Sequence, residues 1–318
     1  MSRIDESRLM VRVTRMYYER GMRQPEIAEH LGISQAKISR LLNRAREDGI
    51  VRITVSIPQG VYSDLEENLI QKFSLRDAIV VEVSEDDNEK MIEREIGAAA
   101  AYYLESIIRH NEVIGISSWS STLLALVDMM HPETKKRSIK VVQILGGVGN
   151  PSAEVHANRL TSRLADLVNG TAVFLPAPGI VGSEAALKVI MDDKYVKEAV
   201  AEFDHITTAL LGIGTVEPSK LLAASGNIFS SAELEILRKN GAVGDILLRF
   251  FDANGNPVKT SLNNRVFSMN LEQLRKADRS IGIAGGHRKY AAVLGALRGN
   301  WINILITDQF TASQLLKG

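Results

Sequence analysis

Apolar and polar residues follow two different patterns along the chain, and the change comes near residue 60. From Gln24 to Asn43, apolar residues recur at helical spacing on two short segments that Gly32 separates. From about residue 78 onward, short apolar runs alternate with longer amphipathic segments, which is typical of strands alternating with helices. A chain of 318 residues is long enough for two domains. The pattern predicts one domain at residues 1–57 and another at residues 58–318, divided near Pro58-Gln59-Gly60.

The first predicted domain contains a helix-turn-helix. One helix is expected over Gln24–Leu31, with Pro25 in its first turn, where a missing N–H costs little. Gly32 can adopt the positive φ that ends this helix. Ser34 is placed to cap a second helix, which continues to about Glu47. The two helices with a glycine between them form the pattern that presents its second helix to DNA.

A third helix and a strand are expected to complete this domain. The small residue Ala28 lets the paired helices approach closely, and Ile33 and Ile38 fill the angle between them. Alternating apolar residues over Ile50–Ile57 predict a strand at one side of a small wing. The third helix is expected at about Glu6–Arg20. Its inward side chains are expected to be Val11, Val13, Met16 and Tyr17.

The second of the paired helices carries outward residue types that contact DNA. Glutamine, asparagine and arginine pair with base edges, whereas serine and lysine suit phosphates. Residues 1–57 hold eleven Lys or Arg against seven Asp or Glu, a charge of +4 on a chain of net charge 0. A helical hairpin used only for packing is the alternative, but the basic excess and the wing pattern favour double-stranded operator DNA as the partner. The predicted DNA-binding residues are Gln24, Ser34, Gln35, Ala36, Lys37, Ser39, Arg40 and Asn43.

The second domain is predicted to be a doubly wound α/β fold, an open sheet with helices on both faces. Several of its apolar runs are continuous, as in parallel strands that are covered on both sides. The segment Val61–Leu75 has helical spacing, and we expect it either to connect the domains or to pair with a second subunit. Strands are expected at Ala78–Val83, Glu112–Ile116, Ile139–Leu145, Thr171–Leu175, His205–Gly212, Ile281–Ala284 and Ile302–Ile306. Helices are expected at Asn88–Arg109, Thr122–Met130, Val155–Val168, Ser183–Val189, Ser231–Lys239, Arg288–Leu297 and Phe310–Leu316.

Polar and glycine-rich turns follow several of the predicted strands. Ligands of open α/β sheets bind beside the carboxyl ends of the strands, so these turns are candidates for one common pocket. The turn Ser117–Thr122 leads into a helix and offers hydroxyl and amide donors to a phosphate, although an ordinary helix cap would look the same. Asp245 could bind sugar hydroxyls, and Lys289 could bind a phosphate. The predicted effector-binding residues are Ser117, Ser120, Ser121, Thr122, Gly146, Gly147, Asp245 and Lys289.

Longer motifs extend along nearly the whole chain. They are Gly32–Ser34, Ile114–Trp119, Gln143–Gly147, Leu175–Pro178, Gly212–Gly214, Gly241–Gly255, Ala284–Lys289 and Ala296–Asp308. Together they resemble the motifs of the SorC/DeoR-type sugar-responsive transcriptional regulators of bacteria. The resemblance implies a winged helix-turn-helix head, an effector domain similar to sugar-phosphate isomerases and deaminases, and a homo-tetramer built from dimers. It also implies a phosphorylated sugar effector, with its phosphate at Ser120–Thr122 and with Asp245 and Lys289 in the same site.

Two residues depart from the pattern of these regulators. Ser120 stands where glycine is common, so a side chain narrows the pocket or adds a donor there. Arg288 stands where glutamate is common, and a basic residue beside Lys289 would suit a more anionic ligand.

Composition limits the other functions open to this chain. It has no cysteine, which excludes disulfides and thiol catalysis, and its six histidines are scattered. We expect no metal, no cofactor and no catalytic residue; with no export signal and no long apolar run, we expect a cytoplasmic protein without a membrane partner. The alternative is an isomerase-like enzyme with a DNA-binding head, in which Asp245, His287 and Lys289 transfer protons. We favour a repressor or activator of a carbohydrate-utilisation operon.

Overall fold

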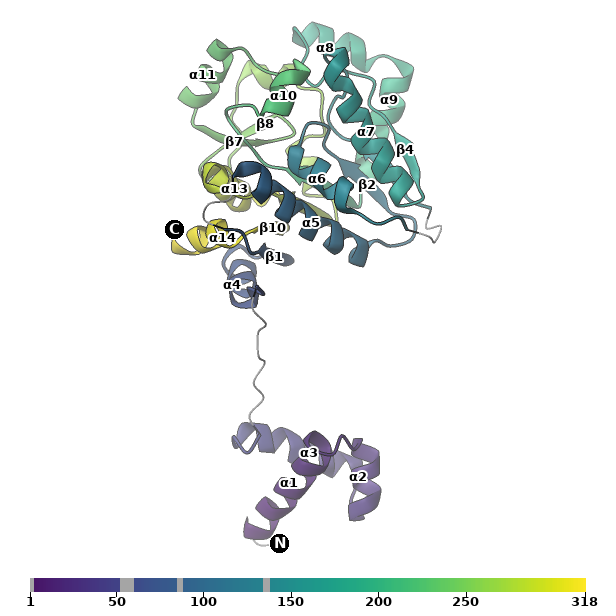
Figure 1. Ribbon diagram of the computed structural model, residues 1–318, viewed down its shortest axis with the longest axis vertical. Helices are drawn as coiled ribbons and strands as arrows, with labels where there is room; N and C mark the ends of the chain where they lie inside the picture. Colours follow the sequence, from purple (N-terminus) through teal and green to yellow (C-terminus); the bar gives the residue numbers. More distant parts are fainter. Residues whose placement is uncertain (1–2, 52–59, 85–87, 134–137) are drawn as a thin grey trace. The chain divides into compact units, whose positions relative to one another are not determined.

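Two compact units make up the chain, Met1–Pro58 and Gln59–Gly318. The computed structural model in Figure 1 describes residues 3–51, 60–84, 88–133 and 138–318. Among these residues, no helix combines the length and the apolar character that a membrane crossing needs. Each unit has hydrophobic side chains packed into an interior of its own.

The first unit is helical over its described residues. Its helices are α1 (Arg3–Tyr18), α2 (Gln24–Leu31) and α3 (Gln35–Glu47). Gly32 ends α2 with a φ of 63°, a left-handed conformation that suits glycine. The Ser34 hydroxyl caps α3 by accepting a hydrogen bond from the Lys37 amide at 3.3 Å. The predicted helix-turn-helix is confirmed, while the strand predicted over Ile50–Ile57 lies almost entirely outside the described residues.

One predicted core residue of this unit is wrong. Val13 is fully buried, and Met16 and Tyr17 pack with it as predicted. Val11, however, is 43% exposed, whereas Met10 is 2% exposed. Residues two apart on a helix point in nearly opposite directions, so Val11 and Val13 cannot both face the core. The three-residue spacing of Met10 and Val13 places both of them on the buried face.

A parallel sheet forms the centre of the second unit. Within the described residues it has seven strands in the order β1-β10-β9-β5-β2-β3-β4, and the neighbouring strands pair in parallel. The strands are β1 (Asp77–Val81), β2 (Val113–Ile116), β3 (Lys140–Gln143), β4 (Thr171–Val173), β5 (Thr208–Gly212), β9 (Arg279–Ile283) and β10 (Ile304–Asp308). Each overlaps one of the predicted apolar runs, so the predicted α/β fold is confirmed.

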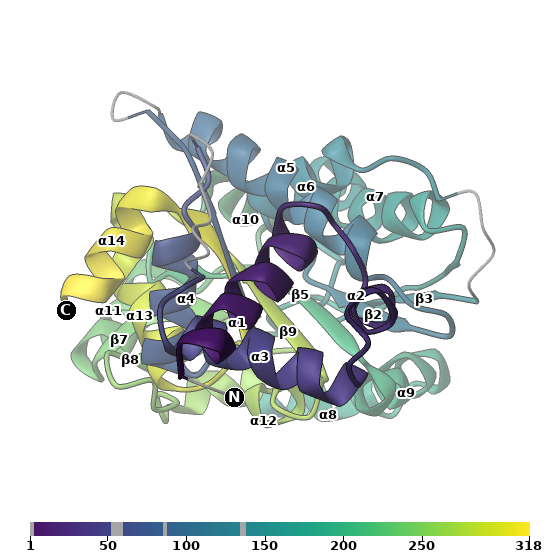
Figure 2. The ribbon, with the colours of Figure 1, turned by 90° about the horizontal axis from the view of Figure 1, so that it is seen from below.

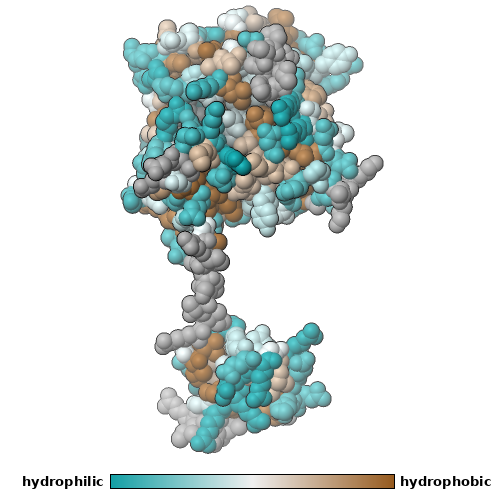
Figure 3. All heavy atoms as spheres, in the orientation of Figure 1, coloured by the Kyte–Doolittle hydropathy of each residue, from teal (hydrophilic) through white to brown (hydrophobic). Residues whose placement is uncertain are grey.

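Helices cover both faces of this sheet, as Figure 2 shows. Ile114 and Ile116 of β2 face a core layer under α5 (Glu89–Ile107), α6 (Ser121–Met129) and α7 (Pro151–Leu167). Leu305 of β10 faces the opposite layer. The helices on that side are α4 (Ser63–Phe73), α8 (Glu184–Met191), α9 (Lys194–Ala201), α11 (Ser231–Lys239), α13 (Tyr290–Arg298) and α14 (Gln309–Lys317). Hydrophilic side chains cover much of the face seen in Figure 3, with smaller hydrophobic areas between them.

Helix α4 packs on the sheet of its own unit. Leu69 is fully buried in the core, and Leu65 and Phe73 pack beside it. The helix lies against β1 and α14. The apolar residues that suggested a connecting helix or a subunit-pairing helix are therefore used within the unit, although Val61 stays 48% exposed.

The sequence pattern does not predict a second, smaller sheet. This sheet is antiparallel and consists of β6 (Gly214–Thr215), β7 (Ala242–Ile246) and β8 (Arg249–Asp252). Strand β6 has two residues, and β7 contains Gly244 and Asp245, residue types that are depleted in strands. Pairing of β7 with the distant strand β6 and with its hairpin partner β8 overrides this local preference. Three helices also fall outside the predicted segments, namely α9, α10 (Lys220–Ser225) and α12 (Leu271–Leu274).

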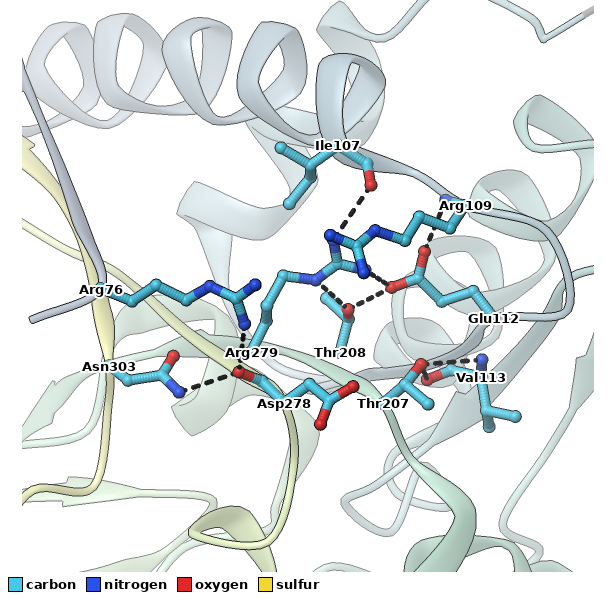
Figure 4. A network of polar contacts seen from close by, with 10 residues as sticks. All are labelled: Arg76, Ile107, Arg109, Glu112, Val113, Thr207, Thr208, Asp278, Arg279 and Asn303. Atoms are coloured by element: carbon cyan, nitrogen blue, oxygen red, sulfur yellow. Dashed lines mark hydrogen bonds and ion pairs between the residues drawn. The ribbon is translucent and has the colours of Figure 1, made fainter.

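A buried ion pair joins the amino ends of three neighbouring strands, as Figure 4 shows. Arg279 at the start of β9 contacts Glu112, just before β2, and their side chains are 7% and 3% exposed. Thr208 of β5 accepts a hydrogen bond from Arg279 Nε at 2.9 Å and donates one to Glu112. Arg279 Nη1 donates to the Ile107 carbonyl at the end of α5 at 3.0 Å. These hydrogen bonds offset the cost of removing both charges from water.

Loss of one partner of this pair should leave an uncompensated buried charge. We expect Glu112→Gln to lower the free energy of unfolding by about 3–5 kcal/mol, and Arg279→Met by a similar amount. The double variant should lose much less than the sum, because no unpaired charge is left. Urea unfolding followed by circular dichroism measures the three losses. Strictly additive losses would show that the two charges do not depend on each other.

Candidate functional site

The predicted DNA-binding residues lie on the outer side of α3 and at the starts of α2 and α3. Ile38, Leu41 and Leu42 turn into the core, so the opposite side of α3 faces outward. The exposed residues of the predicted set are Ser34, Gln35, Ala36, Arg40 and Asn43, and the half-buried ones are Gln24, Lys37 and Ser39. Helix-turn-helix proteins present their second helix to a major groove through such a face.

The arginines of α3 differ in what they contact. Arg44 forms an ion pair with Glu6 of α1 at 3.1 Å. Arg46 Nε donates to the Tyr18 hydroxyl at 2.8 Å, and its guanidinium lies 5.9 Å from the centre of the Tyr18 ring. These two arginines brace α3 against α1. Arg40 instead lies along its own helix, donating to a carbonyl there at 3.3 Å, and is exposed on the outer side of α3.

The second unit has a pocket at the carboxyl ends of its central strands. The chain runs outward from β2 through β3 and β4 and then returns to the other side of β2 with β5. The turns after β2 and β5 therefore diverge and leave a crevice, which is the usual ligand position in open α/β sheets. The pocket has an empty volume of about 650 Å³. It is lined by the turns after these two strands, the β7–β8 hairpin, the first turns of α5, the start of α10 and the 3-10 turn His287–Lys289.

The pocket brings together most of the predicted effector-binding residues. Those in its lining are Ser117, Ser120, Ser121, Asp245 and Lys289. Thr122 is 1% exposed, inside the first turn of α6, and does not line it. The contact of these residues with an effector stays a prediction.

Gly146 and Gly147 lie outside the lining, contrary to their predicted position. The Gly146 carbonyl accepts a hydrogen bond from the Trp119 indole at 3.0 Å. A Cβ atom on Gly146 would collide with the backbone of Pro178, and one on Gly147 would collide with the Gln143 side chain. Both glycines therefore permit close packing behind the pocket.

Sequence reasoning misses three acidic residues of the lining. They are Glu89 and Glu93 on the first turns of α5, and Glu217 between β6 and α10. In the sequence each looks like an ordinary solvated charge, and the fold alone brings them to one pocket. The leucines of the β7–β8 hairpin are missed for the same reason, because nothing local predicts the small sheet.

The two hydroxyls at the start of α6 already have partners. Ser120 Oγ accepts a hydrogen bond from the Leu123 amide at 3.3 Å, as a helix cap does. Ser121 Oγ donates to Glu93 Oε1 at 2.6 Å. A Cβ atom on Gly212 would lie 2.7 Å from Ser120 Oγ, so the end of β5 must be glycine for Ser120 to fit. The helix-cap interpretation thus holds for Ser120, and Ser121 contacts a carboxylate.

Asp245 is held against a strained hairpin. Leu247 and Leu248 join β7 to β8 with φ values of 57° and 62°. Two-residue turns of this kind favour Asn-Gly, because other residues cost about 1–2 kcal/mol each in a left-handed conformation. The Leu248 amide donates to Asp245 Oδ2 at 2.8 Å. Backbone strain of this kind is concentrated at functional sites, which supports the assignment of this pocket.

Asp245 and Lys289 bring two buried ionisable groups to the pocket. Asp245 is 8% exposed, and burial raises its pKa to about 6, although the Leu248 amide and Lys289 act in the opposite direction. Burial also lowers the pKa of Lys289, whose side chain is 14% exposed, while the carboxylates of Glu93 and Glu89 partly restore it. A carboxyl group that titrates near neutrality can both accept and donate hydrogen bonds to ligand hydroxyls.

Two observations concern metal and enzyme chemistry at this pocket. Within the described ranges, no group of three or more histidine or acidic residues could hold a metal ion. His287, one of the three residues that the enzyme alternative requires, lies outside the lining. Its ring stacks against Phe310 with the ring centres 6.3 Å apart.

Known proteins match both units of the chain. A family model described as "Putative sugar-binding domain" matches residues 59–317, and one described as "Winged helix-turn-helix DNA-binding" matches residues 17–52. The sorbitol operon regulator of Klebsiella pneumoniae is 34% identical over 100% of both chains. The deoxyribonucleoside regulator of Bacillus subtilis is 32% identical over 98% of both chains. The crystal structure of the full-length Klebsiella pneumoniae regulator SorC matches with a TM-score of 0.75, 32% identity and 99% coverage of each chain.

The chain belongs to the SorC/DeoR-type family of sugar-binding transcriptional regulators. Its first unit is the DNA-binding part of such a regulator, and its second unit is the sugar-binding part. In this SorC/DeoR-type chain the sugar-binding unit therefore contains the pocket between β2 and β5.

Asp245 should make the stability of this regulator depend on pH. Folding raises its pKa from 3.8 to about 6, so its contribution favours the folded protein below pH 3.8 and is lost as the pH rises through about 6. Relative to Asp245→Asn, the wild type should lose about 2 kcal/mol of unfolding free energy between about pH 4 and pH 7. Urea unfolding at a series of pH values measures the difference.

Asp252 of the same hairpin provides a control, because its pKa is shifted in the opposite direction to that of Asp245. Burial alone would raise its pKa, but amide hydrogen bonds from Asn256 at 2.8 Å and Asn254 at 2.9 Å hold it below the ordinary value. Its stabilisation is therefore present above the unfolded pKa and lost as the pH falls. Asp252→Asn should destabilise the protein at neutral pH and less so in acid. Parallel pH profiles for the wild type and Asp245→Asn would contradict the raised pKa.

Proposed function

We propose that this chain regulates a carbohydrate-utilisation operon. Residues 1–57 would bind the operator, and residues 58–318 would bind a small phosphorylated sugar. The observation that carries the proposal is one chain with both an exposed helix-turn-helix face and a pocket at the strand reversal that holds Asp245, Lys289 and several serine hydroxyls. The names of the sorbitol operon regulator and the deoxyribonucleoside regulator support a sugar-related operon.

The pocket chemistry suits a sugar phosphate. Its lining combines serine, acidic and lysine side chains with leucines, as small-molecule sites usually combine polar and apolar groups. Lys289 and the amino end of α6 favour an anion, since an ammonium group and a helix amino terminus both attract negative charge. Asp245 would bind the sugar hydroxyls at the other side of the lysine. The proposal leaves no role for catalysis, and absence of turnover with sugar phosphates would support it.

We infer that sugar binding acts on DNA through the arrangement of subunits. Helix-turn-helix regulators bind two half-sites with paired heads, so the distance between heads sets affinity. A homo-tetramer formed from dimers would hold the heads on such half-sites as a repressor. An effector that binds one subunit arrangement more tightly would shift the population toward it.

Arg40 should be required for operator binding. We expect Arg40→Ala to weaken binding to the operator by about 1–3 kcal/mol, because a base or phosphate contact would be lost. Arg12→Ala, which removes the same charge from an exposed position on α1, is the matched control and should change affinity much less. The operator would be selected from a random double-stranded library with the full-length protein, and affinities would be measured by fluorescence anisotropy at one salt concentration. Equal losses in both variants would remove α3 as the recognition helix.

Lys289 should distinguish phosphorylated from neutral ligands. A thermal-shift panel of sugars, polyols and their phosphates identifies the ligand class, because a ligand that binds the folded protein raises Tm. We expect Lys289→Ala to weaken a phosphorylated hit by about tenfold or more, since it removes a partly buried cation. Lys220→Ala on α10 serves as an exposed charge control. Hits confined to unphosphorylated compounds would overturn the phosphate part of the proposed function.

A further inference from the structure

Helix α5 packs closely against the middle of α6 because Gly97 lies between them. A Cβ atom on Gly97 would lie 2.7 Å from Ala125 Cβ and 2.9 Å from the Leu126 amide nitrogen of α6. Any larger residue would push the two helices apart. Glu93 is one helical turn before Gly97 and therefore lies beside the first residues of α6.

The Glu93 carboxylate contacts the groups that would bind an effector phosphate. Its Oε1 atom accepts a hydrogen bond from Ser121 Oγ at 2.6 Å. The same oxygen lies 4.0 Å from Lys289 Nζ, and the two side chains are 18% and 14% exposed. A carboxylate at a helix amino end is also favoured by the helix dipole. Glu93 thus supplies a negative charge in the position suited to an external anion.

The other charged side chains of the pocket do not provide the positive charge that a second anion beside Glu93 would need. Arg288 is held by Glu89 Oε1 at 3.0 Å, and both side chains are more than half exposed. Glu217 and Asp245 add further acidic groups to the lining. A phosphate monoester adds a charge of about −1.5 to −2 at neutral pH. It would meet strong repulsion from Glu93 if that carboxylate stayed in place.

We propose that Glu93 is an internal anion that occupies the phosphate position of the pocket and must be displaced by the effector. The proposal rests on the proposed function, in which the effector is a sugar phosphate. Binding then exchanges one pair of contacts for another: Ser121 and Lys289 leave the Glu93 carboxylate and contact the phosphate. Glu93 is therefore a specificity-determining residue, because it lowers the affinity for every phosphate and leaves neutral sugars unaffected.

The test uses the full-length protein and inorganic phosphate as the probe. Calorimetry at constant ionic strength would compare the wild type with Glu93→Gln, which keeps the size of the side chain and removes its charge. We expect Glu93→Gln to bind phosphate about tenfold more tightly. Glu89→Gln is the matched control, one turn away on the same helix and also in the lining, and should change the dissociation constant by less than about threefold, because its charge is exposed and screened.

Two further variants separate displacement from simple charge removal. Glu93→Ala should give the same gain, which keeps the test available if the glutamine variant folds poorly. Adding Ser121→Ala to Glu93→Gln should abolish most of the gain, since the released hydroxyl is then missing. Glucose 6-phosphate should follow inorganic phosphate, and glucose should show no gain. These ligands distinguish the phosphate from the sugar as the source of the effect.

Defined outcomes would overturn the internal-anion proposal. Equal effects of Glu93→Gln and Glu89→Gln on phosphate affinity would mean that the gain comes only from the change in overall charge. Weaker phosphate binding by Glu93→Gln would mean that Glu93 helps to bind the anion. Absence of phosphate binding in the wild type and in both Glu93 variants would show that no phosphate site is being masked. Operator binding by the wild type is measured separately. A protein that binds no operator but shows the gain would lose the proposed regulatory function and keep the masked phosphate site.

Discussion

The reversal of strand order between β2 and β5 is the constraint on which the pocket depends. A parallel sheet brings the carboxyl ends of its strands to one edge, but that edge opens only where successive connections leave in opposite directions. Here the turn after β2 supplies serine hydroxyls, and the turn after β5 supplies glycines that leave room for them. At Gly214, a Cβ atom would collide with the Asp245 carboxylate. Groups from distant parts of the sequence therefore meet because the glycines on the β5 side have no side chains to keep them apart.

Several unfavourable features of the fold lie at the same edge of the sheet. The backbones of Leu247 and Leu248 are in the left-handed conformation. Burial removes the side chains of Asp245 and Lys289 from water, which disfavours their charged forms. The opposite edge also buries charge, but there Arg279 meets a carboxylate in a network of hydrogen bonds. This difference between the two edges supports a binding role for the pocket. Selection for stability alone favours buried charges that are paired within the protein, as at Arg279, whereas a binding site needs groups that pair best with the ligand.

Residues whose roles are local could be predicted from the sequence, and residues whose roles depend on distant partners could not. The turn at Gly32 and the cap at Ser34 follow from short-range chemistry, and the apolar runs locate the strands of the parallel sheet. Gly146 looks like a loop glycine at a ligand, but its packing against Pro178 is set by a strand connection elsewhere. The position of Glu93 in the pocket could not be predicted for the same reason, since the sequence around it is that of an ordinary amphipathic helix. The contact of Glu93 with Ser121 exists only once α5 lies against α6.

The position of Glu93 changes what the two departures from the family pattern mean. Arg288 adds a cation beside Lys289, but its guanidinium is 60% exposed and is already paired with Glu89, so it adds little attraction inside the pocket. Ser120 adds a hydroxyl, but that oxygen caps α6. The groups to which the proposal assigns the phosphate include Ser121 and Lys289, and both contact Glu93. Because Gly97 fixes α5 against α6, the carboxylate cannot withdraw by a shift of the whole helix without disturbing the core. In the proposed exchange of anions, Glu93 would therefore be released by rotation of its side chain, a local change whose effect on affinity can be measured separately from folding.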